Sequence, residues 1–82
     1  MRYRLQISEK ALTQLRLLPK ELRRNIGLRM DLLCDDLQGD VLKLKAASNR
    51  YRLRVGSHRV LFTLEGDCIH VYAVKDRKEA YE

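Results

Sequence analysis

Long apolar runs are absent from this 82-residue chain. Nothing in it approaches the roughly 18 consecutive apolar residues that a membrane-spanning helix requires, so we expect no membrane partner. Repeats, low-complexity tracts and linkers are also lacking, which predicts a single domain over residues 1–82. The first seven residues have no apolar centre of the kind found in signal peptides, and we therefore expect a cytoplasmic protein.

Cysteine and histidine are scarce, with two of each. Cys34 and Cys68 each lie in an apolar pattern, which predicts small buried side chains in a reducing compartment rather than a disulfide. Two lone histidines and two separated cysteines do not have the spacing of a zinc site. The chain also lacks a glycine-rich phosphate loop before a helix and a carboxylate pair typical of glycosidases. We expect no metal and no cofactor.

Positive charge is what the chain has in excess. Its formal net charge is +6 and its sequence pI is about 9.7, which favours anionic partners without naming one. The charge is concentrated, because residues 43–64 contain six lysines and arginines and no acidic residue. RNA is the leading candidate for a partner of such a segment.

The run from Tyr51 to Phe62 alternates apolar and basic residues at the period of a half-buried sheet. A tight turn at Gly56 and Ser57 divides it into two strands. The apolar face of this hairpin is predicted to contain Tyr51, Leu53, Val55, Val60, Phe62 and Leu64. Its other face is predicted to present Arg52, Arg54 and Arg59, whose guanidiniums suit a polyanion.

The whole chain is predicted to be α+β, with the order β-α-α-β-β-β and one largely antiparallel four-stranded sheet. Residues 2–7 alternate as a strand, and Ser8 is a plausible helix N-cap. Apolar residues then recur at helical spacing on either side of Pro19, up to about Leu37, with Gly39 just beyond as the stop signal. The apolar residues that define the two helices are Ala11, Leu12, Leu15, Leu18, Leu22, Ile26, Met30, Leu33 and Leu37.

The last predicted strand runs from Cys68 to Val74 after a turn at residues 65–67. Ile69, Val71 and Ala73 form its more uniformly apolar side and are predicted to face the helices. That arrangement would place His70 and Tyr72 on the same open face as the arginines.

A cluster of basic residues, rather than a motif of fixed spacing, is therefore the predicted site. Arginine binds phosphate oxygens bidentately and stays charged, which suits stabilisation of a phosphate undergoing cleavage. RNA supplies its own nucleophile, the 2′-hydroxyl, so a protein needs only to align it, stabilise charge and move two protons. The candidate catalytic residues are Arg52, Arg54, Arg59, Arg77 and Tyr81. The candidate RNA-binding residues are Lys43, Lys45, Arg50, His58, Lys75 and Lys78.

The run YRLRVGSHRVLF, preceded by LKLKAA and followed by VYAVKDRKEAY, resembles the RelE/ParE superfamily of bacterial and archaeal toxins. The resemblance covers essentially the whole chain and is closest to the RelE branch of messenger-RNA interferases. It implies a toxin that enters the ribosomal A site and cuts the bound message, leaving a 2′,3′-cyclic phosphate. It also implies a cognate antitoxin, here expected to be acidic, partly disordered and able to cover the basic face and the off-stripe residues Leu28 and Leu32.

Position by position, the resemblance assigns Arg52 and Arg54 to two basic residues of the first central strand and Arg59 to a phosphate-binding arginine. It assigns Arg77 to a general acid or leaving-group stabiliser, and Tyr81 to a tyrosine that orients or stacks on the substrate. The RelE pattern has lysines where this chain has Arg52 and Arg54. Arginine cannot act as a general base at pH 7, which leaves assistance from the ribosome or the RNA, or another base such as His58 or His70.

Two other functions stay open from the sequence. A ParE-like toxin would share this fold and act on DNA gyrase instead of RNA. A non-catalytic RNA-binding module would bind RNA with a strong salt dependence and leave it intact.

Overall fold

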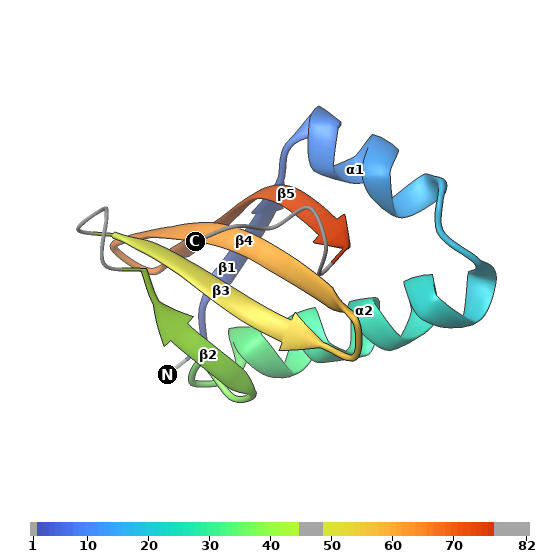
Figure 1. Ribbon diagram of the computed structural model, residues 1–82. Helices are drawn as coiled ribbons and strands as arrows, with labels where there is room; N and C mark the ends of the chain where they lie inside the picture. The colour runs from blue at the N-terminus through green and yellow to red at the C-terminus, as the bar shows by residue number, and fades with distance from the viewer. Residues whose placement is uncertain (1, 45–48, 77–82) are drawn as a thin grey trace.

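Two helices and five strands make up the part of the chain that the structure describes (Figure 1). The structure is a computed structural model, and it describes residues 2–44 and 49–76. The elements are β1 (Arg4–Ile7), α1 (Glu9–Arg16), α2 (Lys20–Cys34), β2 (Asp40–Lys43), β3 (Arg50–Val55), β4 (His58–Glu65) and β5 (Cys68–Asp76). The predicted α+β class, with an N-terminal strand, two helices and a final antiparallel meander, is confirmed.

The strands form one mixed sheet in the order β1-β5-β4-β3-β2. β1 runs parallel to β5, and every other neighbouring pair is antiparallel. The chain therefore places its first strand next to its last one, with α1 and α2 connecting β1 to the opposite edge of the sheet (Figure 1). The expectation of four strands is wrong by one, because β2 was not predicted.

β2 escaped prediction because it is a four-residue edge strand with weak alternation. Short edge strands are common because they limit unwanted pairing, and they leave little pattern in a sequence. Gly39 leads into β2 with a φ of 126°, and a Cβ at this position would lie 2.8 Å from Cδ1 of Leu53. Gly39 thus permits a close approach of the incoming chain to β3, rather than capping α2 as predicted.

The helices begin where the sequence predicts and cover one face of the sheet. The Ser8 side chain accepts a hydrogen bond from the backbone N–H of Ala11 at 3.1 Å, which confirms the N-cap of α1. α2 ends at Cys34, three residues before the predicted end, and Leu37 has a φ of 57° in the following turn. The core residues of the two helices are Ala11, Ile26, Met30, Leu33 and Cys34, with Leu15, Leu18, Leu22 and Leu37 partly buried against them.

The predicted apolar face of the β3–β4 hairpin is confirmed. Leu53, Val55, Val60 and Phe62 are buried in the core, and the rings of Tyr51 and Phe62 stack with centroids 5.4 Å apart. The hairpin turns at Gly56 and Ser57 as predicted, with a φ of 58° at Gly56, the first central position that type II′ turns give to glycine.

β5 departs from simple alternation because it contains a β-bulge. Phe62 pairs with Val71 and Leu61 pairs with Ala73, so Tyr72 is an extra residue on β5. Ile69, Val71 and Val74 consequently face the helices and join the core. Ala73, which was predicted to face the helices, lies opposite Leu61 on the other face, so that part of the prediction is wrong.

Both cysteines are free and buried, as predicted. Neither α1 nor α2, the helices of residues 2–44 and 49–76, is long and apolar enough to cross a membrane.

Candidate phosphate-binding face

The sheet face opposite the helices, here called the outer face, carries three basic residues in one cross-strand row. Arg54 on β3 lies opposite Arg59 on β4, and Arg59 lies opposite Lys75 on β5. Directly opposed side chains in a sheet have Cβ atoms about 5 Å apart, and like charges in that position are destabilising. These three residues, called the basic row below, gather positive charge on the outer face.

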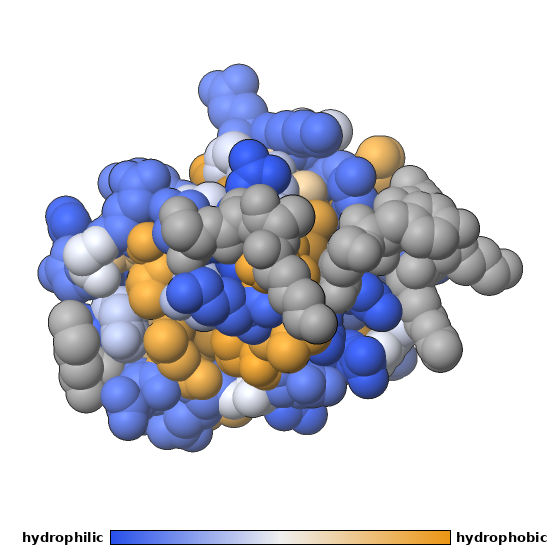
Figure 2. Space-filling model, turned by 60° about the vertical axis from the view of Figure 1, so that its left-hand side comes forward, coloured by the Kyte–Doolittle hydropathy of each residue, from blue (hydrophilic) through white to orange (hydrophobic). Residues whose placement is uncertain are grey.

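The part of the adjacent outer-face row that lies on β3, β4 and β5 is largely removed from solvent. It contains Arg52, Leu61 and Ala73, which are 6 %, 9 % and 2 % exposed. Arg52 lies on the predicted face, but the expectation that it is solvent-exposed is wrong. Figure 2 shows hydrophobic residues at the surface beside hydrophilic ones on this side of the molecule.

One carboxylate from β2 reaches the arginines. Asp40 pairs in register with Arg54, and its two oxygens lie 3.9 Å from Nη1 of Arg52 and 3.8 Å from Nε of Arg54. The Arg52 side chain is 7 % exposed, whereas those of Arg54 and Asp40 are 51 % and 57 % exposed. The sequence led us to expect guanidiniums without acidic neighbours, and that expectation is wrong because the unpredicted strand β2 brings Asp40 beside them.

The opposite end of the outer face combines an aromatic ring with polar side chains. Arg50, Thr63 and His70 are aligned across β3, β4 and β5, which confirms the predicted face of His70. The guanidinium carbon of Arg50 lies 5.5 Å from the centre of the Tyr72 ring, so Tyr72 also lies on this face.

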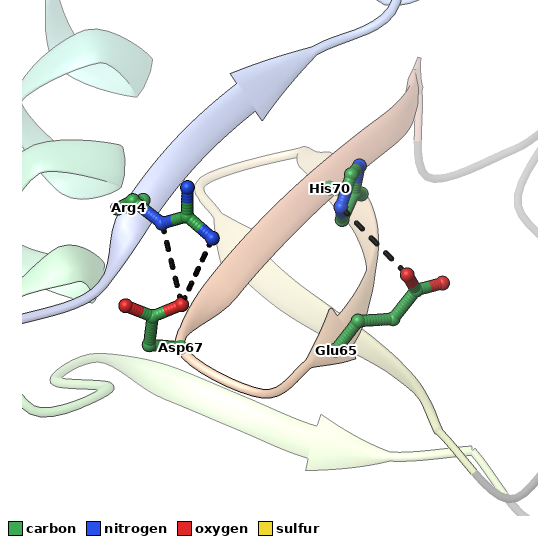
Figure 3. A network of polar contacts seen from close by, with 4 residues as sticks. All are labelled: Arg4, Glu65, Asp67 and His70. Carbon is green, nitrogen blue, oxygen red and sulfur yellow. Dashed lines mark hydrogen bonds and ion pairs between the residues drawn. The ribbon is translucent and has the colours of Figure 1, made fainter.

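Two polar contacts between side chains lie at the β4–β5 turn at this end. Nε2 of His70 lies 3.9 Å from a carboxylate oxygen of Glu65, and Arg4 on β1 donates two hydrogen bonds, of 3.2 and 3.1 Å, to Asp67 (Figure 3). The Arg4–Asp67 pair links β1 to the turn between β4 and β5.

Two predicted site residues lie on the helix-facing side instead. His58 pairs with Val55 and Asp76, is buried, and has Nε2 3.9 Å from a carboxylate oxygen of Asp76. Lys43 is exposed and pairs with Tyr51, which packs against the core. Four other predicted site residues, Lys45, Arg77, Lys78 and Tyr81, lie outside the described residues.

The buried thiol of Cys34 is a poor candidate for chemistry. Burial raises the pKa of the Cys34 thiol, so the reactive thiolate is disfavoured there. Within residues 2–44 and 49–76 there is also no group of three or more histidine, cysteine, aspartate or glutamate residues arranged to hold a metal ion.

Comparison with known protein families identifies the family to which the chain belongs. Residues 5–81 match the model of the ParE toxin of the type II toxin–antitoxin system parDE. The chain belongs to this toxin family. Its relatives place it in the RelE/ParE superfamily and make it RelE-like, in agreement with the resemblance seen in the sequence.

The relatives of the toxin include archaeal and bacterial proteins. Toxin RelE3 of Methanocaldococcus jannaschii is 40% identical over 48 residues, which are 58% of this chain and 54% of that protein, so the match spans about half of that relative. The toxin in an archaeal RelE–RelB complex from Pyrococcus horikoshii is 28% identical, with a TM-score of 0.79 over 98% of this chain and all of that one. A mutant of the Escherichia coli toxin RelE in the free state, 19% identical with a TM-score of 0.81 over 98% of this chain and 88% of that one, shares the fold.

The sequence did not lead us to predict Asp40 or Tyr72 as site residues, although both lie on the outer face of this toxin. Asp40 follows Gly39 and precedes the adjacent apolar residues Val41 and Leu42, which are a weak signal for a short strand. Tyr72 was assigned to the correct face, but no sequence pattern indicated the bulge next to Ala73.

Proposed function

We propose that this toxin is a ribosome-dependent endoribonuclease that cleaves messenger RNA in the ribosomal A site. The observation that supports the proposal is the basic row, in which Arg54, Arg59 and Lys75 lie directly opposite one another on three strands. A phosphate bound there could accept bidentate hydrogen bonds from the guanidiniums of Arg54 and Arg59 and would lie beside the ammonium of Lys75.

The proposed reaction needs no cofactor. The ribose 2′-oxygen attacks the adjacent phosphorus while the bond from phosphorus to the 5′-oxygen breaks, leaving a 2′,3′-cyclic phosphate and a 5′-hydroxyl. Arg54 and Arg59 would stabilise the charge that builds on the non-bridging oxygens, and groups of this kind typically contribute about a hundredfold each in rate. Arg52, although buried, would support the same charge from the next row. Arg77 as acid and Tyr81 as a stacking residue stay predictions from the resemblance.

The proton acceptor in this proposal is Asp40. The two arginines beside it cannot accept a proton at pH 7. His58 is buried on the helix-facing side, and His70 lies in a different row from Arg59, at the other end of the outer face. Asp40 is the described carboxylate in contact with Arg52 and Arg54, and its side chain is more than half exposed, so a ribose hydroxyl can reach it.

The proposal includes a cognate antitoxin as the partner that silences the toxin. The relative from Pyrococcus horikoshii was solved as a RelE–RelB complex. In this chain, Leu28 and Leu32 are 61% and 44% exposed one turn apart on α2, and the net charge is +6. An acidic partner that folds on binding would cover these leucines and neutralise the outer face. Affinity capture from the native host is expected to recover a small acidic protein, and capture that recovers none would contradict this part of the proposal.

The experiment that tests the reaction is a translation assay with purified toxin, in which message 3′ ends are mapped with and without ribosomes. Cuts that require ribosomes and fall at fixed positions within A-site codons are the expected result. Message that stays intact would reject the proposal. In that case trapped gyrase–DNA complexes would point to a gyrase poison, and salt-sensitive binding of intact RNA would point to a binding module.

A further inference from the structure

We propose that Tyr72 and Arg50 form a stacking subsite for one nucleobase of single-stranded RNA on the outer face. The inference rests on the proposed function, because it concerns the same RNA, but it assigns a base-binding role to residues that the phosphate chemistry does not use. The guanidinium carbon of Arg50 lies 5.5 Å from the centre of the Tyr72 ring. Unpaired RNA bases are commonly bound by stacking on aromatic rings and on the planes of guanidiniums.

The bulge in β5 is what presents the Tyr72 ring. In regular alternation, Tyr72 and Ala73 would point to opposite sides of the sheet. Here Ala73 is opposite Leu61 on the outer face, and Tyr72 contacts Arg50, which is aligned with Thr63 and His70 on that face. Two successive residues therefore point outward, and bulges are frequent near functional sites because they redirect side chains in this way.

Contacts from the α1 region fix the bulge. The backbone N–H of Ser8 donates to the carbonyl of Val71 at 2.9 Å, and the Ser8 hydroxyl lies 3.4 Å from the carbonyl oxygen of Tyr72. The backbone N–H of Val74 donates to Oε1 of Gln14 at 2.6 Å. The backbone on both sides of Tyr72 is thus held by side chains and main chain outside the β4–β5 ladder, which fixes the backbone from which the ring projects.

The position of the Tyr72 ring relative to the basic row fits a bound strand of RNA. Tyr72 precedes Lys75 by three residues, which corresponds to roughly 10 Å along a strand. The outer-face row between them contains Leu61 and Ala73 on β4 and β5, two apolar side chains that are largely buried and add no charge between the Tyr72 ring and the basic row. A phosphate at the basic row would thus leave a neighbouring nucleotide free to place its base on Tyr72.

The test uses the full chain and a short single-stranded oligonucleotide that cannot be cleaved because its 2′-hydroxyls are methylated. One base is replaced by 2-aminopurine, whose fluorescence is quenched by stacking. The wild type and Tyr72→Phe are expected to bind and quench the probe. Tyr72→Ala is expected to bind about 5- to 150-fold more weakly and to leave the bound probe bright, because stacking of one base on an aromatic side chain contributes about 1–3 kcal/mol.

A second variant, Arg50→Lys, tests the subsite even if Tyr72→Ala does not fold. Arg50→Lys keeps the positive charge and leaves the bulge intact but removes the planar group, so it is expected to reduce quenching while the salt dependence of binding is retained. An oligonucleotide with an abasic position in place of 2-aminopurine serves as the matched ligand. The wild type and Tyr72→Ala are expected to bind it equally.

Three results would overturn the subsite: equal binding and quenching by the wild type and Tyr72→Ala, an equal loss on the abasic ligand, or no binding of the free oligonucleotide by any variant. None of these would decide the proposed function, which depends on ribosome-dependent cuts in the translation assay. Conversely, binding and Tyr72-dependent quenching without any cleavage on ribosomes would support the subsite and reject the nuclease.

Discussion

The two faces of the sheet follow different rules, and β3 shows both. On the helix-facing side, Leu53 and Val55 are almost fully buried, as the alternation of apolar residues predicts. On the outer face, Arg52 and Arg54 come from the same strand and the same side of it, yet one side chain is 7 % exposed and the other 51 %. On β3, alternation decides which face a residue occupies, but the neighbouring strands decide what surrounds it there.

The same contrast separates stability from function. The helix-facing side is a continuous apolar core contributed by both helices and the sheet, and its loss should unfold the protein. The outer face places like charges opposite one another and buries an arginine, neither of which a sheet needs for folding. Substitutions on the two faces should therefore separate stability from activity.

The largest expected effect is on the helix-facing side. Phe62→Ala removes a fully buried ring that stacks on Tyr51, and we expect the free energy of unfolding to fall by about 3–5 kcal/mol. Leu42→Ala is the matched control, because Leu42 is 48% exposed on the outer face. Urea denaturation followed by circular dichroism measures both, and a similar loss in the two variants would contradict the division between the faces.

Arg59→Ala is expected to reduce cleavage of ribosome-bound message by about a hundredfold, the scale of one lost charge-stabilising donor, in a protein that stays folded. Binding of RNA should weaken, and its dependence on salt should decrease by about one unit of slope, because one phosphate contact is lost. Arg23→Ala, at an exposed position of α2, is the control that removes the same charge elsewhere. Equal activity in the two variants would remove Arg59 from the site.

Asp40→Asn separates proton transfer from phosphate binding on the same face. Loss of a general base typically costs at least about a hundredfold, so cleavage should fall by that order. RNA binding should not weaken, because the substitution removes a negative charge that lies within 4 Å of Arg52 and Arg54. Single-turnover cleavage and equilibrium binding measured on one preparation distinguish the roles. A variant that binds RNA more weakly but cleaves normally once saturated would show that Asp40 only orders the arginines.

The features that the sequence predicts correctly are those that depend on residues close together in the chain. The cap at Ser8, the turn at Gly56 and the apolar face of β3 depend on residues close in the chain, and all three are confirmed. The contact between Asp40 and the arginines joins residues of two strands, and it required β2, which has too few residues for a periodic pattern. Cross-strand register is a property of pairs of segments, so the charge environment of Arg52 could not be obtained from its own segment.

The bulge at Tyr72 links the two faces, because Gln14 of α1 binds the β5 backbone next to a ring on the outer face. The change in stability expected from a substitution there is the smallest of those considered. Gln14→Ala removes the acceptor of the Val74 N–H and leaves that group without its side-chain partner, so we expect a loss of about 1–2 kcal/mol in unfolding free energy. Gln6→Ala, an exposed glutamine on β1, should change stability by no more than about 0.5 kcal/mol. Because Val74 sits two residues from Tyr72, Gln14→Ala should also reduce quenching of the 2-aminopurine probe at saturating protein. A variant that loses stability but still quenches the probe fully would contradict this expectation. It would show that α1 stabilises β5 without positioning the Tyr72 ring.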